Sequence, residues 1–256
     1  MLGAIIGDVV GSRFEYNNTN SLNFVLFTPE SGFTDDTICS IAVADAIMSG
    51  RSFTESIHYW CRKYPYPKGG YGGSFVRWVQ SENPKPYNSF GNGSAMRVSA
   101  CAWLSGSESN TLAFAKESAE CTHNHPEGVK GALAVADAIW LLRMGHTKEQ
   151  LKLAISSNFG YNLNQTCNEI REGNSFNETC QVTVPQAIVA FLESDNFEHA
   201  IRLAVSLGGD SDTIAAITGS IAEAYYFIPA FMEEAALSRV TRELKGMFLT
   251  FKKYML

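Results

Sequence analysis

The segment Leu207-Gly208-Gly209-Asp210-Ser211-Asp212-Thr213 leads directly into a largely apolar stretch, Ile214 to Ile228. The glycine pair frees the backbone, and the Asp, Ser and Thr side chains carry oxygens that accept the N–H groups left unpaired in the first turn of a helix. The pattern therefore predicts a helix that begins at this point. Its acids flank Ser211, which places more negative charge at the helix start than one cap requires.

A second helix start of the same kind lies far upstream, where Thr34-Asp35-Asp36-Thr37 opens the apolar segment Ile38 to Met48. Taken singly, each start is typical of a helix cap whose acids are favoured by the helix dipole. Carboxylate and hydroxyl oxygens are also hard ligands for Mg²⁺ or Mn²⁺, and a site with two metal ions needs several carboxylates from different parts of a fold. If the two starts face each other, they form such a site.

Length and charge limit the classes of protein that fit the sequence. With 256 residues, of which 45% are hydrophobic, the chain can bury one large core, and we expect one domain over residues 1–256. The 20 basic and 26 acidic residues give a net charge of −6. Because the chain also lacks a run of Lys or Arg, we do not expect a nucleic-acid groove as its main purpose.

The N-terminal sequence and the cysteines indicate the compartment. No basic region precedes the first apolar residues, and no apolar run reaches the length of a membrane span. The six cysteines include no Cys-x-x-Cys pair and lie mostly within apolar segments. We therefore expect a cytoplasmic protein with reduced, packed thiols and no membrane partner.

Glycines mark the first predicted helix. Gly3, Gly7 and Gly11 are four positions apart, so in a helix they line one bare stripe that another backbone can approach closely. The alternative is a poorly helical, glycine-rich segment, because each interior glycine weakens a helix. If the helix forms, Asp8 and Glu15 lie in it and just beyond it, where their carboxylates can point into a cleft.

Two glycine-rich loops are candidates for ligand binding. Gly91-Asn92-Gly93-Ser94 precedes an apolar segment, Ala95 to Leu104, which reads as a helix. The backbone N–H groups of this loop could converge on a phosphate with help from the helix N-terminus, although a plain turn fits equally well. The loop from Tyr64 to Gly73 contains four glycines, which allow close approach to a ligand or merely sharp turns.

The rest of the chain reads as helices, and we predict an all-α fold of about ten helices without a strand ladder. The polar region from Phe159 to Gln181 reads as irregular, with Pro185 opening the next helix, Gln186 to Leu192. His123 and His125 have no Cys or third His at a zinc-like spacing, so hydrogen bonding at a pocket wall is the preferred interpretation.

Motifs along nearly the whole chain resemble those of the ADP-ribosylglycohydrolase family, which includes dinitrogenase reductase-activating glycohydrolases and ADP-ribosyl-acceptor hydrolases. The resemblance is carried, in the family's order, by Gly3-Ala-Ile-Ile-Gly-Asp-Val-Val-Gly11, Phe14-Glu15, Phe33-Thr-Asp-Asp-Thr37, Gly91-Asn-Gly-Ser-Ala-Met-Arg97, Thr122-His123 and Leu207-Gly-Gly-Asp-Ser-Asp-Thr-Ile-Ala-Ala216.

The resemblance implies a single-domain orthogonal bundle of helices with two divalent cations, Mg²⁺ or Mn²⁺, in a cleft. The implied metal ligands are Thr34, Asp35, Asp36, Asp210, Asp212 and Thr213. The implied substrate contacts are Gly72, Ser89, Phe90, Gly91, Asn92, Gly93, Ser94 and His123. Glu15 corresponds to the family's flexible-loop glutamate and is the first choice for the general acid or base, a role that Asp36 or Asp212 could share.

The activity implied by the resemblance is hydrolysis of the bond between ADP-ribose and an acceptor. The leading substrate is ADP-ribosyl-arginine on a protein. Serine-linked ADP-ribose, O-acetyl-ADP-ribose and ADP-ribosylated nucleic acid remain alternatives, as does a binding module without activity. Loss of the metal-site acids would favour the binding module, but all of them are present.

Overall fold

The computed structural model describes residues 1–255; Leu256, the last residue of the expected domain, lies outside this range. These residues form fourteen α-helices and one 3-10 turn, η1 (Asn92–Ser94), with isolated bridges but no strand. The helices are α1 (Leu2–Gly11), α2 (Asp35–Ser49), α3 (Phe53–Lys63), α4 (Gly73–Gln80), α5 (Ser99–Trp103), α6 (Glu108–Glu120), α7 (Pro126–Arg143), α8 (Lys148–Phe159), α9 (Cys167–Gly173), α10 (Cys180–Glu193), α11 (Phe197–Ser206), α12 (Ser211–Ala222), α13 (Ala230–Leu237) and α14 (Arg242–Tyr254).

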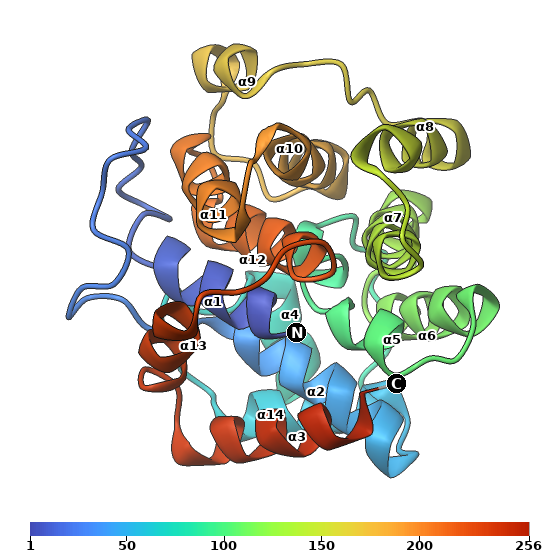
Figure 1. The fold of residues 1–256 in the computed structure, drawn as a ribbon. Coiled ribbons are helices and arrows are strands. Elements are labelled where there is room, and N and C mark those ends of the chain that lie inside the picture. Colours follow the sequence, from blue (N-terminus) through green and yellow to red (C-terminus); the bar gives the residue numbers. More distant parts are fainter. Residues whose placement is uncertain (256) are drawn as a thin grey trace.

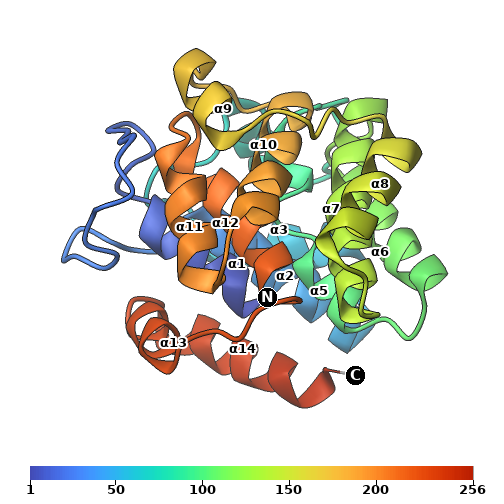
Figure 2. The ribbon, with the colours of Figure 1, turned by 45° about the horizontal axis from the view of Figure 1, so that its top comes forward.

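The helices pack around α1 and α12 at the centre of the molecule (Figure 1). Helices α10 and α11 flank α12, whereas α13 and α14 cover α1 and α2 from another side (Figure 2). Helices α6, α7 and α8 form a further group. The buried apolar side chains belong to one cluster that extends through all of these groups, so the all-α, single-domain prediction is confirmed.

The glycine stripe on α1 explains why α1 and α12 pack so closely. A Cβ atom at Gly3 would lie 2.0 Å from the carbonyl oxygen of Gly219, and one at Gly7 would lie 2.0 Å from that of Ala215. At Gly11 it would lie 2.5 Å from the Cα of Asp212. The predicted stripe is confirmed, and it places the backbone of α1 directly against the start of α12.

Two helix boundaries predicted from the sequence differ from the structure. The segment after the Gly91 loop is not one helix, because η1 is followed by turns and α5 begins only at Ser99. The α10 helix begins at Cys180, so Pro185 lies inside it rather than at its start. The backbone N–H of Cys180 donates to the carbonyl of Phe90, and that of Asn92 donates to the carbonyl of Glu178, just before the helix. No local sequence pattern predicts these contacts.

The region read as irregular contains α9, which the sequence prediction missed. Thr166 accepts a bond from the backbone of Glu169, whose side chain in turn accepts from the backbone of Thr166. This reciprocal capping box is visible in the sequence and could have predicted the start of α9. Elsewhere the predictions hold: the Ser52 and Thr147 capping boxes form, and all six cysteines are free and buried.

Among residues 1–255, no helix has both the length and the apolar character that a bilayer crossing requires.

The buried carboxyl group of Asp137, which lies outside the central helix pair, leads to a testable prediction about stability. Asp137 in α7 is 2% exposed, and its Oδ1 has no hydrogen-bond partner among the described residues. Burial, followed by the charge of Glu108, raises the pKa of Asp137 to about 6. A raised folded-state pKa stabilises the protein below the unfolded pKa, and this stability is lost as the pH rises through about 6.

Asp137→Asn is therefore expected to gain stability relative to the wild type between pH 4 and pH 7.5, by about 1 to 2 kcal/mol after solvent screening is allowed for. Thermal melts across this pH range provide the measurement. Glu82→Gln, a change at an exposed acid, serves as the control and should show no such pH dependence. A constant difference between Asp137→Asn and the wild type at every pH would contradict the prediction.

Candidate active site

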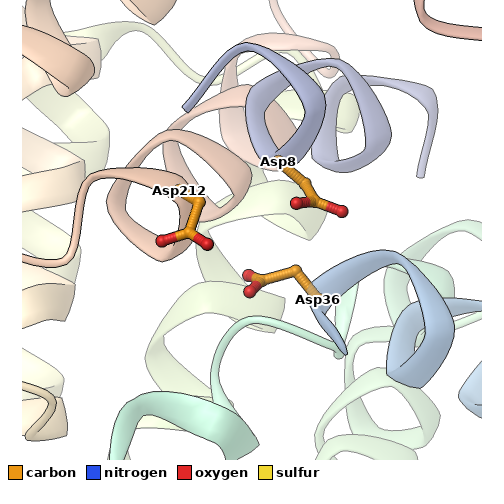
Figure 3. A group of neighbouring side chains, drawn as sticks. All are labelled: Asp8, Asp36 and Asp212. Carbon is orange, nitrogen blue, oxygen red and sulfur yellow. The ribbon is translucent and has the colours of Figure 1, made fainter. Parts of the chain in front are cut away.

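The two acidic helix starts lie face to face. The hydroxyl of Thr213, in the first turn of α12, donates to Oδ2 of Asp36, in the first turn of α2, over 3.1 Å and 177 sequence positions. Asp8, Asp36 and Asp212 each offer a carboxylate oxygen, and these atoms lie within 4.8 Å of one another. Figure 3 shows the three side chains projecting from three different helices into the space between them. The predicted meeting of the two starts is confirmed.

Helix capping explains only part of this arrangement. At α2 the hydroxyl of Thr34 accepts a bond from the backbone N–H of Asp36, so Thr34 is the cap. At α12 the N-cap residue Asp210 makes no capping bond with its side chain. Its carboxylate instead accepts a bond of 2.6 Å from the side-chain amide of Asn92. The acids at both starts therefore exceed what capping uses.

A second group of acids shares one member with the first. Glu15, Asp210 and Asp212 also offer oxygens that lie within 4.8 Å of one another. Glu15 lies on the loop after α1, and Gly69, with φ of 76°, lets another loop pass beside it. A Cβ at Gly69 would lie 2.6 Å from Oε2 of Glu15. Two carboxylate triads thus meet at Asp212.

Asn18 ties the Glu15 loop to the start of α12. Its side-chain oxygen accepts from the backbone N–H of Gly209 at 2.8 Å, and its amide donates to the carbonyl of Gly209 at 2.9 Å. The same amide donates to the carbonyl of Phe14. Because Gly208 and Gly209 both have positive φ, the loop before Asp210 depends on glycine and on this clamp for its shape.

Asp8 forms hydrogen bonds with residues at the start of α2. Its carboxylate accepts bonds from the backbone N–H and hydroxyl groups of both Thr34 and Thr37. These bonds lower the pKa of Asp8, but burial outweighs them and raises it to about 6. With its oxygens engaged in this way, Asp8 fixes the geometry of Thr34 and of the helix start that carries Asp36.

The electrostatics of the cluster favour a cation. Burial raises the pKa values of Asp36 and Asp212 well above the ordinary range, and neighbouring carboxylates raise them further. Oδ1 of Asp36 is buried and has no hydrogen-bond partner among the described residues. An unpaired carboxylate oxygen surrounded by further carboxylate and hydroxyl oxygens is the donor set that Mg²⁺ and Mn²⁺ prefer. The residues present therefore fit such ions.

Glu15, Asp210 and Asp212 of the acid cluster line a cavity of about 300 Å³. The cavity wall includes most of the candidate site residues from the sequence analysis, namely Glu15, Asp35, Gly72, Ser89, Gly91, Asn92, Gly93, His123, Asp210, Asp212 and Thr213. Several loops and the two helix starts, all distant in sequence, thus surround one space. The glycines on one wall leave backbone atoms accessible beside the acids.

Four of the singled-out residues do not line the cavity. Thr34 and Asp36 are buried behind its wall, in the acid cluster. The Ser94 hydroxyl donates to the carbonyl of Gly128 at 2.7 Å and is occupied within the fold. Phe90 is 46% exposed and packs its ring edge-to-face against the ring of His125, with centroids 5.3 Å apart.

Sequence reasoning did not assign some residues that the structure places at the site. Asp8 was expected to point into a cleft from a glycine-striped helix, but it was not assigned to the metal site, because its position beside Asp36 depends on tertiary packing. Tyr16 and Glu178 line the cavity, and Asn18 clamps the Gly209 loop. Glu178 lies in the polar region that was read as irregular, and nothing in its local sequence distinguishes it from its polar neighbours.

The fold and the site together define an all-α protein with a carboxylate cluster at the wall of a glycine-lined cavity. The family model for ADP-ribosylglycohydrolase matches residues 1–244. The chain therefore belongs to the ADP-ribosylglycohydrolase family, which is a family of enzymes.

Individual relatives agree with this assignment. The chain is 26% identical to ADP-ribosylhydrolase ARH3 of Homo sapiens, over 88% of this chain and 84% of that protein. It is 26% identical to ADP-ribosylarginine hydrolase Tri1 of Pseudomonas putida, over 95% of this chain and 75% of that protein. The solved structure of an ADP-ribosylglycohydrolase-related protein complex matches with a TM-score of 0.72 at 25% identity, covering 100% of this chain and 97% of that one.

Proposed function

We propose that this chain hydrolyses the bond between C1 of the distal ribose of ADP-ribose and an arginine side chain of an ADP-ribosylated protein, with two divalent cations as cofactors. The observation that supports this most strongly is the pair of carboxylate triads that share Asp212 beside the cavity. Asp212, which belongs to both triads, is placed to be a ligand shared by two ions, with Asp36 on one side and Asp210 on the other. Family membership supplies the type of bond that is hydrolysed.

The proposed metal ligands come from both helix starts: Thr34, Asp35, Asp36, Asp210, Asp212 and Thr213. Divalent cations, Mg²⁺ or Mn²⁺, would orient the ribose hydroxyls and a water molecule and lower the pKa of that water. Asn92 orients Asp210 through its amide, and Thr213 orients Asp36 through its hydroxyl. The carboxylates that line the cavity stabilise the positive charge that grows at C1 as the bond breaks.

Glu15 is the proposed general acid or base. It lines the cavity from a loop, whereas the other acids of the two triads lie on α1 or at a helix start. A carboxylate that is not fixed at a helix start can reach both the water and the leaving group. Asp36 and Asp212 are the alternatives for this role, and both lie deeper in the cluster.

The glycine loop is the proposed site for the diphosphate and adenosine part of the substrate. Ser89, Gly91 and Gly93 line the cavity, and a Cβ at Gly93 would lie 3.3 Å from the ring of His123. The ring of His123 therefore lies beside the glycine loop at this wall. Gly72 lines the cavity from the Tyr64 loop and leaves room for the ligand there.

Arginine is the proposed acceptor because the cavity is lined with acids. Glu15, Asp35 and Glu178 all contribute to its wall, and a guanidinium group is a cation that such a wall attracts. The similarity to an ADP-ribosylarginine hydrolase over 95% of this chain favours the same acceptor.

The test is release of ADP-ribose from arginine-, serine- and nucleic-acid-linked substrates and from O-acetyl-ADP-ribose, each with and without chelator. We expect release from the arginine-linked substrate, abolished by chelation and restored by Mn²⁺ or Mg²⁺. Glu15→Gln is expected to lower kcat by roughly 10²-fold or more while retaining ADP-ribose binding. Turnover that survives chelation would refute the metal-dependent mechanism, and ADP-ribose binding without turnover of any substrate would favour a binding module.

A further inference from the structure

Arg97 is a buried guanidinium group that lies at the cavity wall. It is 1% exposed, yet it is among the residues that line the cavity. One terminal nitrogen donates to the carbonyl of Ser118 at 2.5 Å and to the hydroxyl of Thr122 at 2.8 Å, and it also contacts the thiol of Cys121. These partners are all neutral, and an arginine can only donate hydrogen bonds.

The Thr122 hydroxyl forms hydrogen bonds with both Arg97 and His123. The Thr122 hydroxyl accepts from Arg97, and it lies 2.7 Å from Nδ1 of His123. A hydroxyl carries one proton and two lone pairs, so the Thr122 oxygen could accept from a protonated Nδ1 as well as from Arg97. The buried Thr122 proton would then have no acceptor among the described residues, which costs free energy, whereas donation to an unprotonated Nδ1 of His123 satisfies it.

The environment of His123 keeps its ring neutral. Burial, followed by the positive charge of Arg97, lowers the pKa of His123 well below the ordinary value. A neutral imidazole with a bare Nδ1 carries its proton on Nε2. The contacts of the ring thus select one of its two tautomers.

Nε2 of His123 faces the glycine loop. A Cβ atom at Gly93 would lie 3.3 Å from Nε2, and one at Gly91 would lie 3.5 Å from it. His123 and both glycines line the cavity. The single ring proton is therefore presented beside the backbone that is proposed to hold the diphosphate.

We infer that Arg97 and Thr122 are positioning residues that hold His123 as a neutral, Nε2-protonated ring, whose N–H donates to a diphosphate oxygen of the substrate at the Gly91–Gly93 loop. This inference rests on the proposed function for its ligand. In this arrangement His123 is a fixed hydrogen-bond donor and does not exchange protons during the reaction. Because Arg97 has only neutral partners, its charge also favours an anion at this wall.

The tautomer can be measured without activity. Nitrogen-15 NMR of histidine-labelled protein distinguishes the two neutral tautomers and the protonated ring, and His123→Gln identifies the His123 signals among those of the five histidines. We expect a neutral, Nε2-protonated ring in the wild type and in Thr122→Ser. In Thr122→Val, which removes the donor to Nδ1, the Nδ1-protonated form should appear. An Nδ1-protonated or charged ring in the wild type, or an unchanged ring in Thr122→Val, would overturn the inference.

Ligand affinity provides the second measurement. Thr122→Val is expected to weaken ADP-ribose binding by about tenfold in titration calorimetry, and to raise KM while kcat changes little. Thr122→Ser should restore wild-type affinity. Thr218→Val is the matched control, because it also removes a buried hydroxyl, one that donates to the carbonyl of Ala187 and does not line the cavity.

The outcomes separate the two claims. If the wild type binds ADP-ribose and Thr122→Val binds it equally well, the positioning role is refuted and the proposed function stands. If the wild type does not bind ADP-ribose, the proposed function fails, and the inferred role of the His123 N–H fails with its ligand. An equal loss of affinity in Thr218→Val and Thr122→Val would show a general effect of buried hydroxyls and would also refute the inference.

Discussion

Asp212→Asn is expected to abolish hydrolysis and, in the presence of chelator, to raise the melting temperature of the protein. Asp212 is the member common to both carboxylate triads, so its loss disrupts both proposed metal positions. We expect kcat/KM to fall by roughly 10³-fold or more, which corresponds to about 4 kcal/mol of transition-state stabilisation.

The rise in stability has a separate cause. Without a cation, Asp212 is a buried carboxylate close to Asp210, Asp36 and Glu15, and burial together with these neighbours disfavours its charged form. Asparagine has nearly the same shape and can still accept the bond from the backbone N–H of Thr213. Removing the charge should therefore raise the melting temperature by several degrees, since about 1 kcal/mol corresponds to roughly 2 to 4 °C in a chain of this size.

Addition of Mg²⁺ or Mn²⁺ should reverse the order of the two proteins. A ligand that binds only the native state stabilises it, by about 2.7 kcal/mol at a hundredfold excess over Kd. The wild type should gain this stability, whereas Asp212→Asn should gain little. Differential scanning fluorimetry of both proteins with chelator, with Mg²⁺ and with Mn²⁺ gives the six melting temperatures needed. A variant that melts below the wild type in chelator, or that gains as much from metal, would contradict this explanation.

Gly7→Ala is expected to cause the largest loss of stability among single methyl additions to the central helices. The added Cβ would lie 2.0 Å from the carbonyl oxygen of Ala215 and 2.6 Å from the backbone nitrogen of Ala216. No rotamer change relieves a contact between two backbones, so α1 and α12 must move apart. We expect a loss of about 3 kcal/mol or more in the free energy of unfolding, or roughly 6 to 12 °C in melting temperature.

Gly246→Ala is the matched control for this prediction. Gly246 also lies inside a helix, α14, but a Cβ there meets nothing within 4 Å. Alanine is the better helix former by about 0.5 to 1 kcal/mol, so this variant should melt slightly above the wild type. Opposite signs for the same chemical change would identify helix contact as the cause. If Gly7→Ala melted like Gly246→Ala, the close packing of α1 on α12 would be wrong.

The features that were predicted correctly from the sequence are those with strong local signals. The capping boxes at Ser52 and Thr147, the glycine stripe on α1 and the hydroxyl-plus-acid helix starts all appear as expected. The surplus of acids over caps indicated a metal site if the two starts faced each other, and the family resemblance implied that they do. That argument identified Asp36 and Asp212 as members of one cluster.

The features that were missed depend on contacts between distant segments. The start of α10 is determined by its backbone bonds to the Phe90 loop, which outweigh the signal from Pro185. The roles of Asp8 and Asn18 likewise arise from hydrogen bonds to residues that are not their sequence neighbours. Asparagine and aspartate are common in loops and at helix ends, so their identity alone does not reveal such partners.

The central claim is that the two acidic helix starts bind divalent cations between them. Crystals grown with Mn²⁺ and measured at a wavelength where manganese scatters anomalously would test it most directly. We predict two anomalous peaks beside Asp212, one on the side of Asp36 and one on the side of Asp210 and Glu15. The absence of any peak at this cluster, in crystals where the protein is folded as described here, would contradict the claim.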